Sequence, residues 1–137
     1  MKVRYANKSD FNWLANLERH VSSAWVSRCI ANKEYLICER EGDRIGFLRY
    51  SYFWGAIPYM DMIFILEHHR RGGAGTALFN FWKTKMEENG AKILMTSSVT
   101  EEKEPQEWHY RNGFEESGQL TFGQYDPSPE IFFVKNL

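Results

Sequence analysis

Hydrophobic residues recur with two different periods along the chain, and together they predict a mixed α/β fold. Alternating or continuous hydrophobic runs predict strands, whereas apolar residues three or four positions apart predict helices. The predicted strands are Val3–Tyr5, Tyr35–Cys38, Ile45–Trp54, Tyr59–Leu66, Lys92–Thr96, Gln119–Phe122 and Ile131–Val134. The first predicted helix is capped by Ser9 or Asp10, and the second covers Val21–Ala31. A third follows the glycine-rich segment and contains Leu78, Phe81, Trp82 and Met86, and a fourth covers Pro105–Asn112. The order β-α-α-β-β-β-α-β-α-β-β places the helices around one central sheet.

Turn and capping residues set several boundaries between these elements. Glu41-Gly42-Asp43 predicts the turn of a hairpin, and Gly55–Pro58 interrupts the hydrophobic pattern before the next strand. Asn89-Gly90 is typical of the end of a helix. No repeat or Pro/Gly/Ser-rich linker divides the chain, so we expect one domain over residues 1–137.

Composition and charge exclude several classes of protein. The net charge is -1, which argues against binding to nucleic acid, because such proteins usually carry a basic excess. No apolar run is long enough to span a membrane, and the first residues do not resemble a signal peptide. Cys29 and Cys38 form no CxxC motif, which argues against a metal site. These features predict a cytoplasmic protein with reduced thiols.

A glycine-rich segment between a strand and a helix is the most informative motif. It comprises Arg70-Arg71-Gly72-Gly73-Ala74-Gly75-Thr76. The first amide N–H groups of a helix have no partner within the helix, and the helix dipole makes that end positive. Glycines let a phosphate approach the backbone, so the segment predicts a phosphate site. It matches neither the P-loop nor the dinucleotide-binding fingerprint, and a flexible turn before a helix is the alternative.

Several motifs resemble those of the GNAT family of N-acetyltransferases. Arg70-x-x-Gly73-x-Gly75 is similar to the family's Arg/Gln-x-x-Gly-x-Gly/Ala motif. Trp108–Phe114 resembles the aromatic-Tyr-x-x-x-Gly-Phe helix end of the family, and Ile45–Phe47 resembles its third strand. The chain departs from the pattern in two places. Glu67-His68-His69 replaces a proline-containing turn, and His109 occupies the tyrosine position.

The resemblance implies an α/β GNAT-like fold with a mostly antiparallel sheet that splays apart between its fourth and fifth strands. It implies acetyl-CoA as co-substrate, bound in that opening, with no metal. The acceptor would be a small-molecule or peptide amine, and the family pattern is also compatible with a homodimer. The cofactor-binding residues that it implies are Phe64, Ile65, Arg70, Arg71, Gly72, Gly73, Ala74, Gly75 and Thr76.

Asp61 is a candidate catalytic residue because it is the one charged residue in an otherwise apolar strand. Transfer of acetyl to an amine requires that the ammonium lose a proton. Asp61 therefore suits the role of base or of ammonium anchor, and an exposed carboxylate at the start of a strand is the alternative. Aromatic residues are frequent, and two or three of them are expected to line an acceptor cavity. The candidates are Trp25, Tyr52, Trp54, Tyr59 and Trp108.

His109 and Tyr110 compete for the role of acid toward the leaving thiolate. Adjacent helical residues point about 100° apart, so both cannot face the sulfur equally. His109 occupies the family position, whereas Tyr110 retains the family's side chain one residue later. The departure at this position gives weight to an alternative function, a non-catalytic module that binds or senses acyl-CoA.

Overall fold

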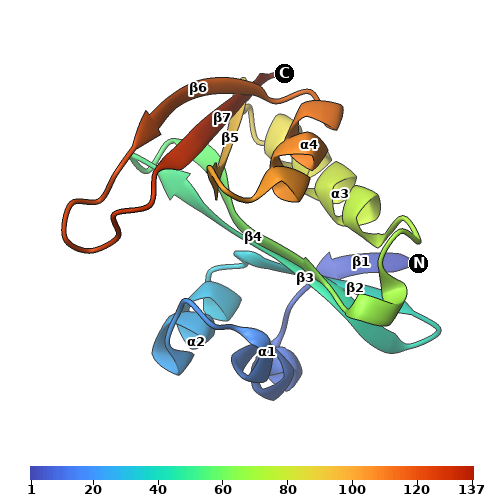
Figure 1. Cartoon of the computed structure of the whole chain (residues 1–137). Helices are drawn as coiled ribbons and strands as arrows, with labels where there is room; N and C mark the ends of the chain where they lie inside the picture. The colour runs from blue at the N-terminus through green and yellow to red at the C-terminus, as the bar shows by residue number, and fades with distance from the viewer. The chain divides into compact units, whose positions relative to one another are not determined.

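The structure is a computed structural model that describes all residues from Met1 to Leu137 (Figure 1). Its strands are β1 (Lys2–Tyr5), β2 (Tyr35–Arg40), β3 (Asp43–Phe53), β4 (Ile57–Ile65), β5 (Ile93–Val99), β6 (Glu115–Leu120) and β7 (Glu130–Asn136). Its α-helices are α1 (Phe11–Leu17), α2 (Ser23–Ala31), α3 (Ala74–Glu88) and α4 (Lys103–Arg111). The strands follow the order β1-β2-β3-β4-β5-β7-β6. The predicted mixed α/β class is confirmed.

Two compact units make up the chain. One comprises Met1–Tyr50 and Met62–Lys85, and the other comprises Ser51–Asp61 and Met86–Leu137. The expectation of one domain over residues 1–137 stays a prediction. Each unit is described separately below.

The first unit has a layer of helices on each face of its antiparallel strands. Strands β1, β2 and β3 pair in antiparallel order, with Val3 opposite Cys38 and Ile37 opposite Phe47. Because alternate side chains point to opposite faces, Ile37 and Phe47 pack with α1 and α2 in one cluster. That cluster contains Ala6, Leu14, Val26, Cys29, Ile30, Tyr35, Ile37 and Phe47. On the other face, α3 packs Trp82 against Tyr50, with ring centroids 6.0 Å apart.

Two polar networks are buried in the first unit. Asp10, which is fully buried, accepts hydrogen bonds from Arg4 at 2.8 and 2.9 Å and from Arg44 at 2.7 Å. Glu18 follows α1 and accepts hydrogen bonds from Tyr35 and from Arg49, the latter at 2.6 Å. Asp10 and Glu18 flank α1, so these ion pairs connect both ends of that helix to the strands of the first unit.

The second unit is built from β5, β6, β7 and α4, together with the adjoining ends of β3 and β4. Strand β4 pairs in parallel with β5 through Tyr59–Met95 and Met60–Thr96. Strand β7 lies antiparallel between β5 and β6. Helix α4 packs on this sheet through His109, whose ring centroid is 5.0 Å from that of Phe133. The resemblance implies that the sheet splays apart between these two strands, and their pairing is limited to these two residue pairs.

Several predicted boundaries are wrong by a few residues. The strand predicted at Gln119–Phe122 is instead Glu115–Leu120, because it is an exposed strand whose polar side chains carry no hydrophobic signal. Strand β4 begins at Ile57, two residues before the predicted start, and includes Pro58. The segment Lys8–Asp10 forms a 3₁₀ turn capped by Asn7 before α1 begins. These shifts leave the predicted order of elements unchanged.

Candidate functional site

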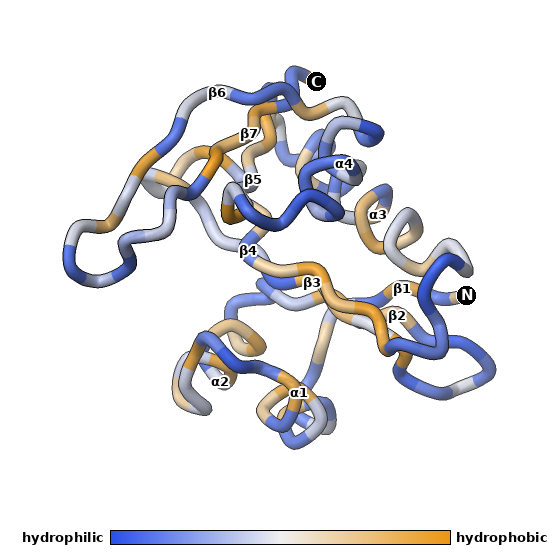
Figure 2. The backbone as a smooth tube through the Cα atoms, viewed as in Figure 1, coloured by the Kyte–Doolittle hydropathy of each residue, from blue (hydrophilic) through white to orange (hydrophobic).

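The glycine-rich loop of the first unit joins β4 to α3. Along this segment the hydrophobic end of β4 gives way to a hydrophilic loop (Figure 2). Glu67–His69 forms a 3₁₀ turn, and Arg71 and Gly73 then adopt positive φ angles of 64° and 91°. The first helical hydrogen bond runs from the amide of Ala77 to the carbonyl of Gly73 at 2.9 Å. The preceding amides therefore point away from the helix at its positive end.

Arg70 binds to the strand that precedes the loop. Its Nε donates a hydrogen bond of 3.0 Å to the carbonyl of Ile65, and its guanidinium lies 5.9 Å from the ring centroid of Phe64. Arg70 is exposed, so its outer nitrogens remain near solvent. The side chain thus combines a structural contact with a positive charge at the start of the loop.

Two further contacts hold the loop backbone in place. Arg40 of β2 donates a hydrogen bond of 3.1 Å to the carbonyl of Gly72. At Gly46 of β3, an added Cβ would lie 2.7 Å from the carbonyl oxygen of Phe64, so only glycine permits this close approach of β3 and β4. The amide of Leu66 donates to the carbonyl of Ile45 at 2.8 Å. The loop therefore leaves β4 from a fixed position.

This geometry fits a pyrophosphate group. Gly72 and Gly73 are exposed and lack Cβ atoms, and the amides of residues 73–76 lie at the start of a 15-residue helix. Arg40, Arg70 and Arg71 supply positive charge around that start. Backbone amides and guanidinium groups are the usual partners of phosphate oxygens.

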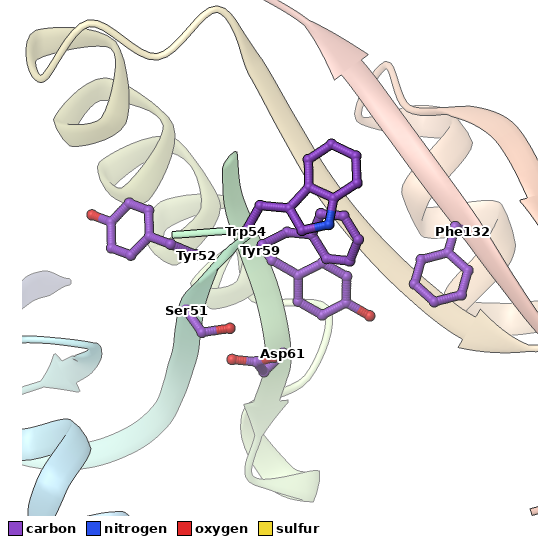
Figure 3. Close-up of a pocket in the computed structure, with 7 residues that line it drawn as sticks. Ser51, Tyr52, Trp54, Tyr59, Asp61 and Phe132 are labelled. Carbon is purple, nitrogen blue, oxygen red and sulfur yellow. The ribbon is translucent and has the colours of Figure 1, made fainter. Parts of the chain in front are cut away.

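A cavity of about 350 Å³ lies in the second unit (Figure 3). Five of the seven side chains that line it are aromatic, and one is a carboxylate. The lining residues are Ser51, Tyr52, Phe53, Trp54, Tyr59, Asp61 and Phe132. Figure 3 shows the rings of Trp54 and Tyr59 above the carboxylate of Asp61, with Ser51 beside it. Asp61 therefore lies in a cavity wall rather than at an isolated strand end.

Tyr59 connects the cavity to a second carboxylate. Its hydroxyl shares a hydrogen bond with Ser97 Oγ, which donates to Glu130 Oε2 at 2.7 Å. Burial raises the pKa of Tyr59 to about 12, and the negative charges of Asp61 and Glu130 act in the same direction. Tyr59 therefore keeps its proton at neutral pH, and its ring is held in one orientation.

Helix α4 places its two candidate residues differently. His109 is 4% exposed and packs against Phe114 and Phe133, and its Nδ1 atom is buried without a hydrogen-bond partner. Burial lowers the pKa of His109 to about 4, so the imidazole is neutral at pH 7. Tyr110 is 49% exposed, with the edge of its ring against Phe133. Of the two, only Tyr110 presents a large part of its side chain to solvent.

The other predicted candidates divide between the cavity and the rest of the surface. Tyr52, Trp54 and Tyr59 line the cavity, whereas Trp25 and Trp108 do not. The sequence pattern does not indicate that Ser51, Phe53 and Phe132 line a cavity, nor that Ser97 links Tyr59 to Glu130. The one sequence feature that pointed to any of these residues is Gly55, which indicates a hairpin turn next to Phe53.

The comparisons with known proteins agree with this geometry. The model of the family described as "Acetyltransferase (GNAT) domain" matches residues 31–116. The chain is 29% identical over 135 residues to an uncharacterized N-acetyltransferase, YhfO, of Bacillus subtilis strain 168, covering 85% of this chain and 91% of that protein.

Two solved structures illustrate the likeness of the fold. One is ribosomal-protein-alanine N-acetyltransferase from Brucella melitensis, with a TM-score of 0.82, 21% identity and 100% of both chains covered. The other is an aminoglycoside 6'-N-acetyltransferase complexed with coenzyme A, with a TM-score of 0.81, 14% identity, and 99% of this chain and 97% of that chain covered.

The chain belongs to the GNAT family of acetyltransferases. It is an acetyl-CoA-dependent N-acetyltransferase, as the motifs predict, and its acceptors are amines. In the structure, no group of three or more His, Cys, Asp or Glu side chains could hold a metal ion. None of its helices is long and apolar enough to cross a membrane. The homodimer stays a prediction.

Proposed function

We propose that the loop from Arg70 to Thr76 holds the pyrophosphate of acetyl-CoA and that the cavity beside Asp61 receives the acceptor amine. The observation that carries the first part is the loop backbone, in which Arg71 and Gly73 have positive φ immediately before α3. Amides at this helix start and the charges of Arg70 and Arg71 suit a doubly ionised phosphate group. Backbone groups of Phe64 and Ile65 would bind the pantetheine arm as an added strand does.

Acetyl-CoA, when bound, supplies an activated thioester. The residues of the chain have to bind the ammonium, remove one proton from it and stabilise the thiolate that leaves. An alkyl amine has a pKa near 10.4, so at neutral pH nearly all of it enters as ammonium. Asp61 attracts that ammonium and accepts its proton, directly or through water, which leaves the nitrogen lone pair free to attack.

Tyr110 is the residue that we assign to the leaving thiolate. The buried imidazole of His109 has a pKa of about 4, so it holds no proton that it could release as an acid at pH 7. Tyr110 is exposed on the same helix, and its hydroxyl is a hydrogen-bond donor. A phenol can donate a hydrogen bond to a thiolate, which lowers the barrier to its departure. His109 then serves to position the helix.

A turnover assay with a panel of primary amines tests this proposal. Acetyl-CoA is incubated with the protein and each amine, and both free thiol and acetylated amine are measured. We expect thiol release to depend on the amine and to match product formation. Tyr110→Phe should reduce turnover more than it changes the affinity for acetyl-CoA, and Asp61→Asn should do the same. Binding of acetyl-CoA without turnover of any amine would instead favour an acyl-CoA sensor.

We also propose that the protein acts in the cytoplasm, where acetyl-CoA is available. The two cysteines support this, because Cys29 and Cys38 are both buried and form no disulfide. Labelling of both thiols after denaturation of protein taken directly from cells, without reductant, would agree with this proposal. Recovery of either cysteine in an oxidised form would contradict it.

A further inference from the structure

The cavity beside Asp61 has the composition of a site for cations. Aromatic rings carry negative charge on their faces, and a group of them can surround an ammonium ion. Here the rings come from separate parts of the second unit. Phe53 and Trp54 form one pair, with centroids 4.8 Å apart, and Tyr59 and Phe132 form another, with centroids 6.3 Å apart. The carboxylate of Asp61 lines the cavity together with these rings.

Trp54 occupies a strained position at the edge of this cavity. It and Gly55 form the centre of the hairpin turn between β3 and β4, with φ angles of +57° and +67°. The turn is closed by a hydrogen bond from the amide of Ala56 to the carbonyl of Phe53 at 3.0 Å. Asparagine or glycine is normal at the position of Trp54, because a bulky residue there costs free energy. Strain of this kind collects at ligand sites.

The exposure of Trp54 adds a second cost. Its side chain is 84% exposed, although burial of an indole would be favourable. A large ring that is held in solvent on a strained turn contributes little to folding. Its place in the cavity wall, beside Tyr59 and Asp61, gives it a use in binding (Figure 3).

Two carboxylates give this wall a negative potential. Asp61 lines the cavity itself, and Glu130 lies behind Tyr59 through the hydrogen bonds of Ser97. The charges of both carboxylates act on the hydroxyl of Tyr59. The wall formed by Tyr59 and Asp61 therefore favours a positively charged ligand.

We propose that these rings and Asp61 form an aromatic cage for an alkylammonium head group, which defines the class of acceptor. This inference rests on the proposed function, in which the same cavity receives the amine. The cage distinguishes an ammonium carried on short alkyl groups from a neutral group of equal shape. It predicts that quaternary ammonium ions bind as well, although they have no N–H to be acetylated.

A pair of isosteric ligands tests the cage without any turnover. Choline and 3,3-dimethylbutan-1-ol have nearly the same shape, but only choline carries a positive charge. Calorimetry on the protein without acetyl-CoA should show at least tenfold tighter binding of choline. Trp54→Leu should weaken choline binding by about 2- to 5-fold, the range expected for loss of one exposed cation–π contact. Equal affinity for the two ligands would overturn the proposal.

Tyr125→Leu is the matched control, because Tyr125 is 93% exposed in the same unit but does not line the cavity. It should leave choline affinity unchanged, and thermal unfolding should verify that both variants fold. Equal losses in the two variants would contradict a role for Trp54. Asp61→Asn should also weaken choline binding, and it should do so without changing the affinity for 3,3-dimethylbutan-1-ol.

Kinetics then separate the cage from the assignment of the acceptor site. Tetramethylammonium should raise the KM for the amine and leave kcat unchanged. If choline binds to the cage but tetramethylammonium does not compete with the amine, the cage stands and the assignment of the acceptor site fails. Parallel assays with a free alkylamine and with a lysine-containing peptide identify which source supplies the head group. Turnover of either one supports the class that we propose, and turnover of amides alone would overturn it.

Discussion

Substitution of Gly73 by alanine should weaken acetyl-CoA binding through the backbone alone. Gly73 has a φ of +91°, a conformation that costs an alanine about 1–2 kcal/mol. The new Cβ would lie 3.3 Å from the terminal methyl of Met1, which is the end of a flexible side chain and can move. Backbone strain therefore dominates, and the loop can relieve it only by rotating the amides at the start of α3.

The expected loss of affinity follows from the hydrogen bonds that this rotation removes. A hydrogen bond to a charged group contributes about 1.5–3 kcal/mol. Loss of one such bond raises the Kd for acetyl-CoA by about 10- to 100-fold, since about 1.4 kcal/mol corresponds to a factor of ten. Calorimetry with acetyl-CoA and with free CoA should show equal losses, because the two ligands share the pyrophosphate.

Gly90 provides the matched control for this experiment. It also has a φ of +91°, it follows α3 at the other end, and an added Cβ would meet no atom within 4 Å. Gly90→Ala should reduce the free energy of unfolding as much as Gly73→Ala does, but it should leave the Kd for acetyl-CoA unchanged. If the two variants lose equal stability and both bind acetyl-CoA normally, the loop does not hold the pyrophosphate.

Three further predictions concern charge. Asp61→Asn should lower kcat most at low pH and leave the Kd for acetyl-CoA nearly unchanged, which pH–rate profiles and calorimetry measure. Burial lowers the pKa of His109 from 6.5 to about 4. As the pH falls, the imidazole of the unfolded chain is therefore protonated at a higher pH than that of the folded protein. The free energy of unfolding should decrease by about 3 kcal/mol between pH 7 and pH 4 for this reason. Urea unfolding of the wild type and of His109→Phe across that range measures this contribution, which the variant should lack. Asp10→Asn should reduce the free energy of unfolding by about 2 kcal/mol, because it leaves Arg4 and Arg44, both partly exposed, without their buried partner.

The pH dependence of the stability difference between wild type and Asp10→Asn provides the control for this experiment. Burial alone would raise the pKa of Asp10, but hydrogen bonds from Arg4, from the Asn7 amide and from Arg44 outweigh it and hold the pKa well below its usual value. Its contribution should therefore be complete at neutral pH, begin to decrease near pH 4, the reference pKa of the carboxyl, and be lost as the pH falls through the much lower pKa of the folded state. Equal stability of wild type and Asp10→Asn at pH 7 would contradict this account.

For Asp61, a wild-type pH–rate profile in the Asp61→Asn variant would exclude this residue from the mechanism.

Much of the fold could be predicted because local patterns and tertiary packing agree over most of the chain. Ile37 and Phe47 lie in runs of hydrophobic residues, and they are also the residues that pack beneath α1 and α2. Strand β6 was misplaced because every side chain from Glu115 to Leu120 is exposed, so its strand conformation depends on pairing with β7 alone. A single sequence carries no signal for such a pairing.

Only the part of the candidate site that consists of one continuous segment could be predicted from the sequence. The glycine-rich loop is contiguous, so its residues and the start of α3 stand together in the sequence. The cavity instead combines Trp54 and Asp61 with Phe132, which lies far from both along the chain and meets them only through the pairing of strands. The burial of His109 could not be predicted either, because the sequence pattern of a short helix does not indicate whether a polar residue faces solvent or packs against a ring such as that of Phe133.

The position of the cavity wall at a hairpin tip bears on how this protein can evolve. Phe53, Trp54 and Gly55 are exposed at the end of β3, outside the hydrophobic interior. Substitutions at these exposed positions have little effect on the free energy of unfolding, so many different side chains are compatible with a folded protein. The loop that we propose to bind acetyl-CoA instead contacts Arg40 on β2, and the strand that precedes it lies close to Gly46 on β3. Selection for a new acceptor can therefore act on the tip while the donor chemistry is inherited intact.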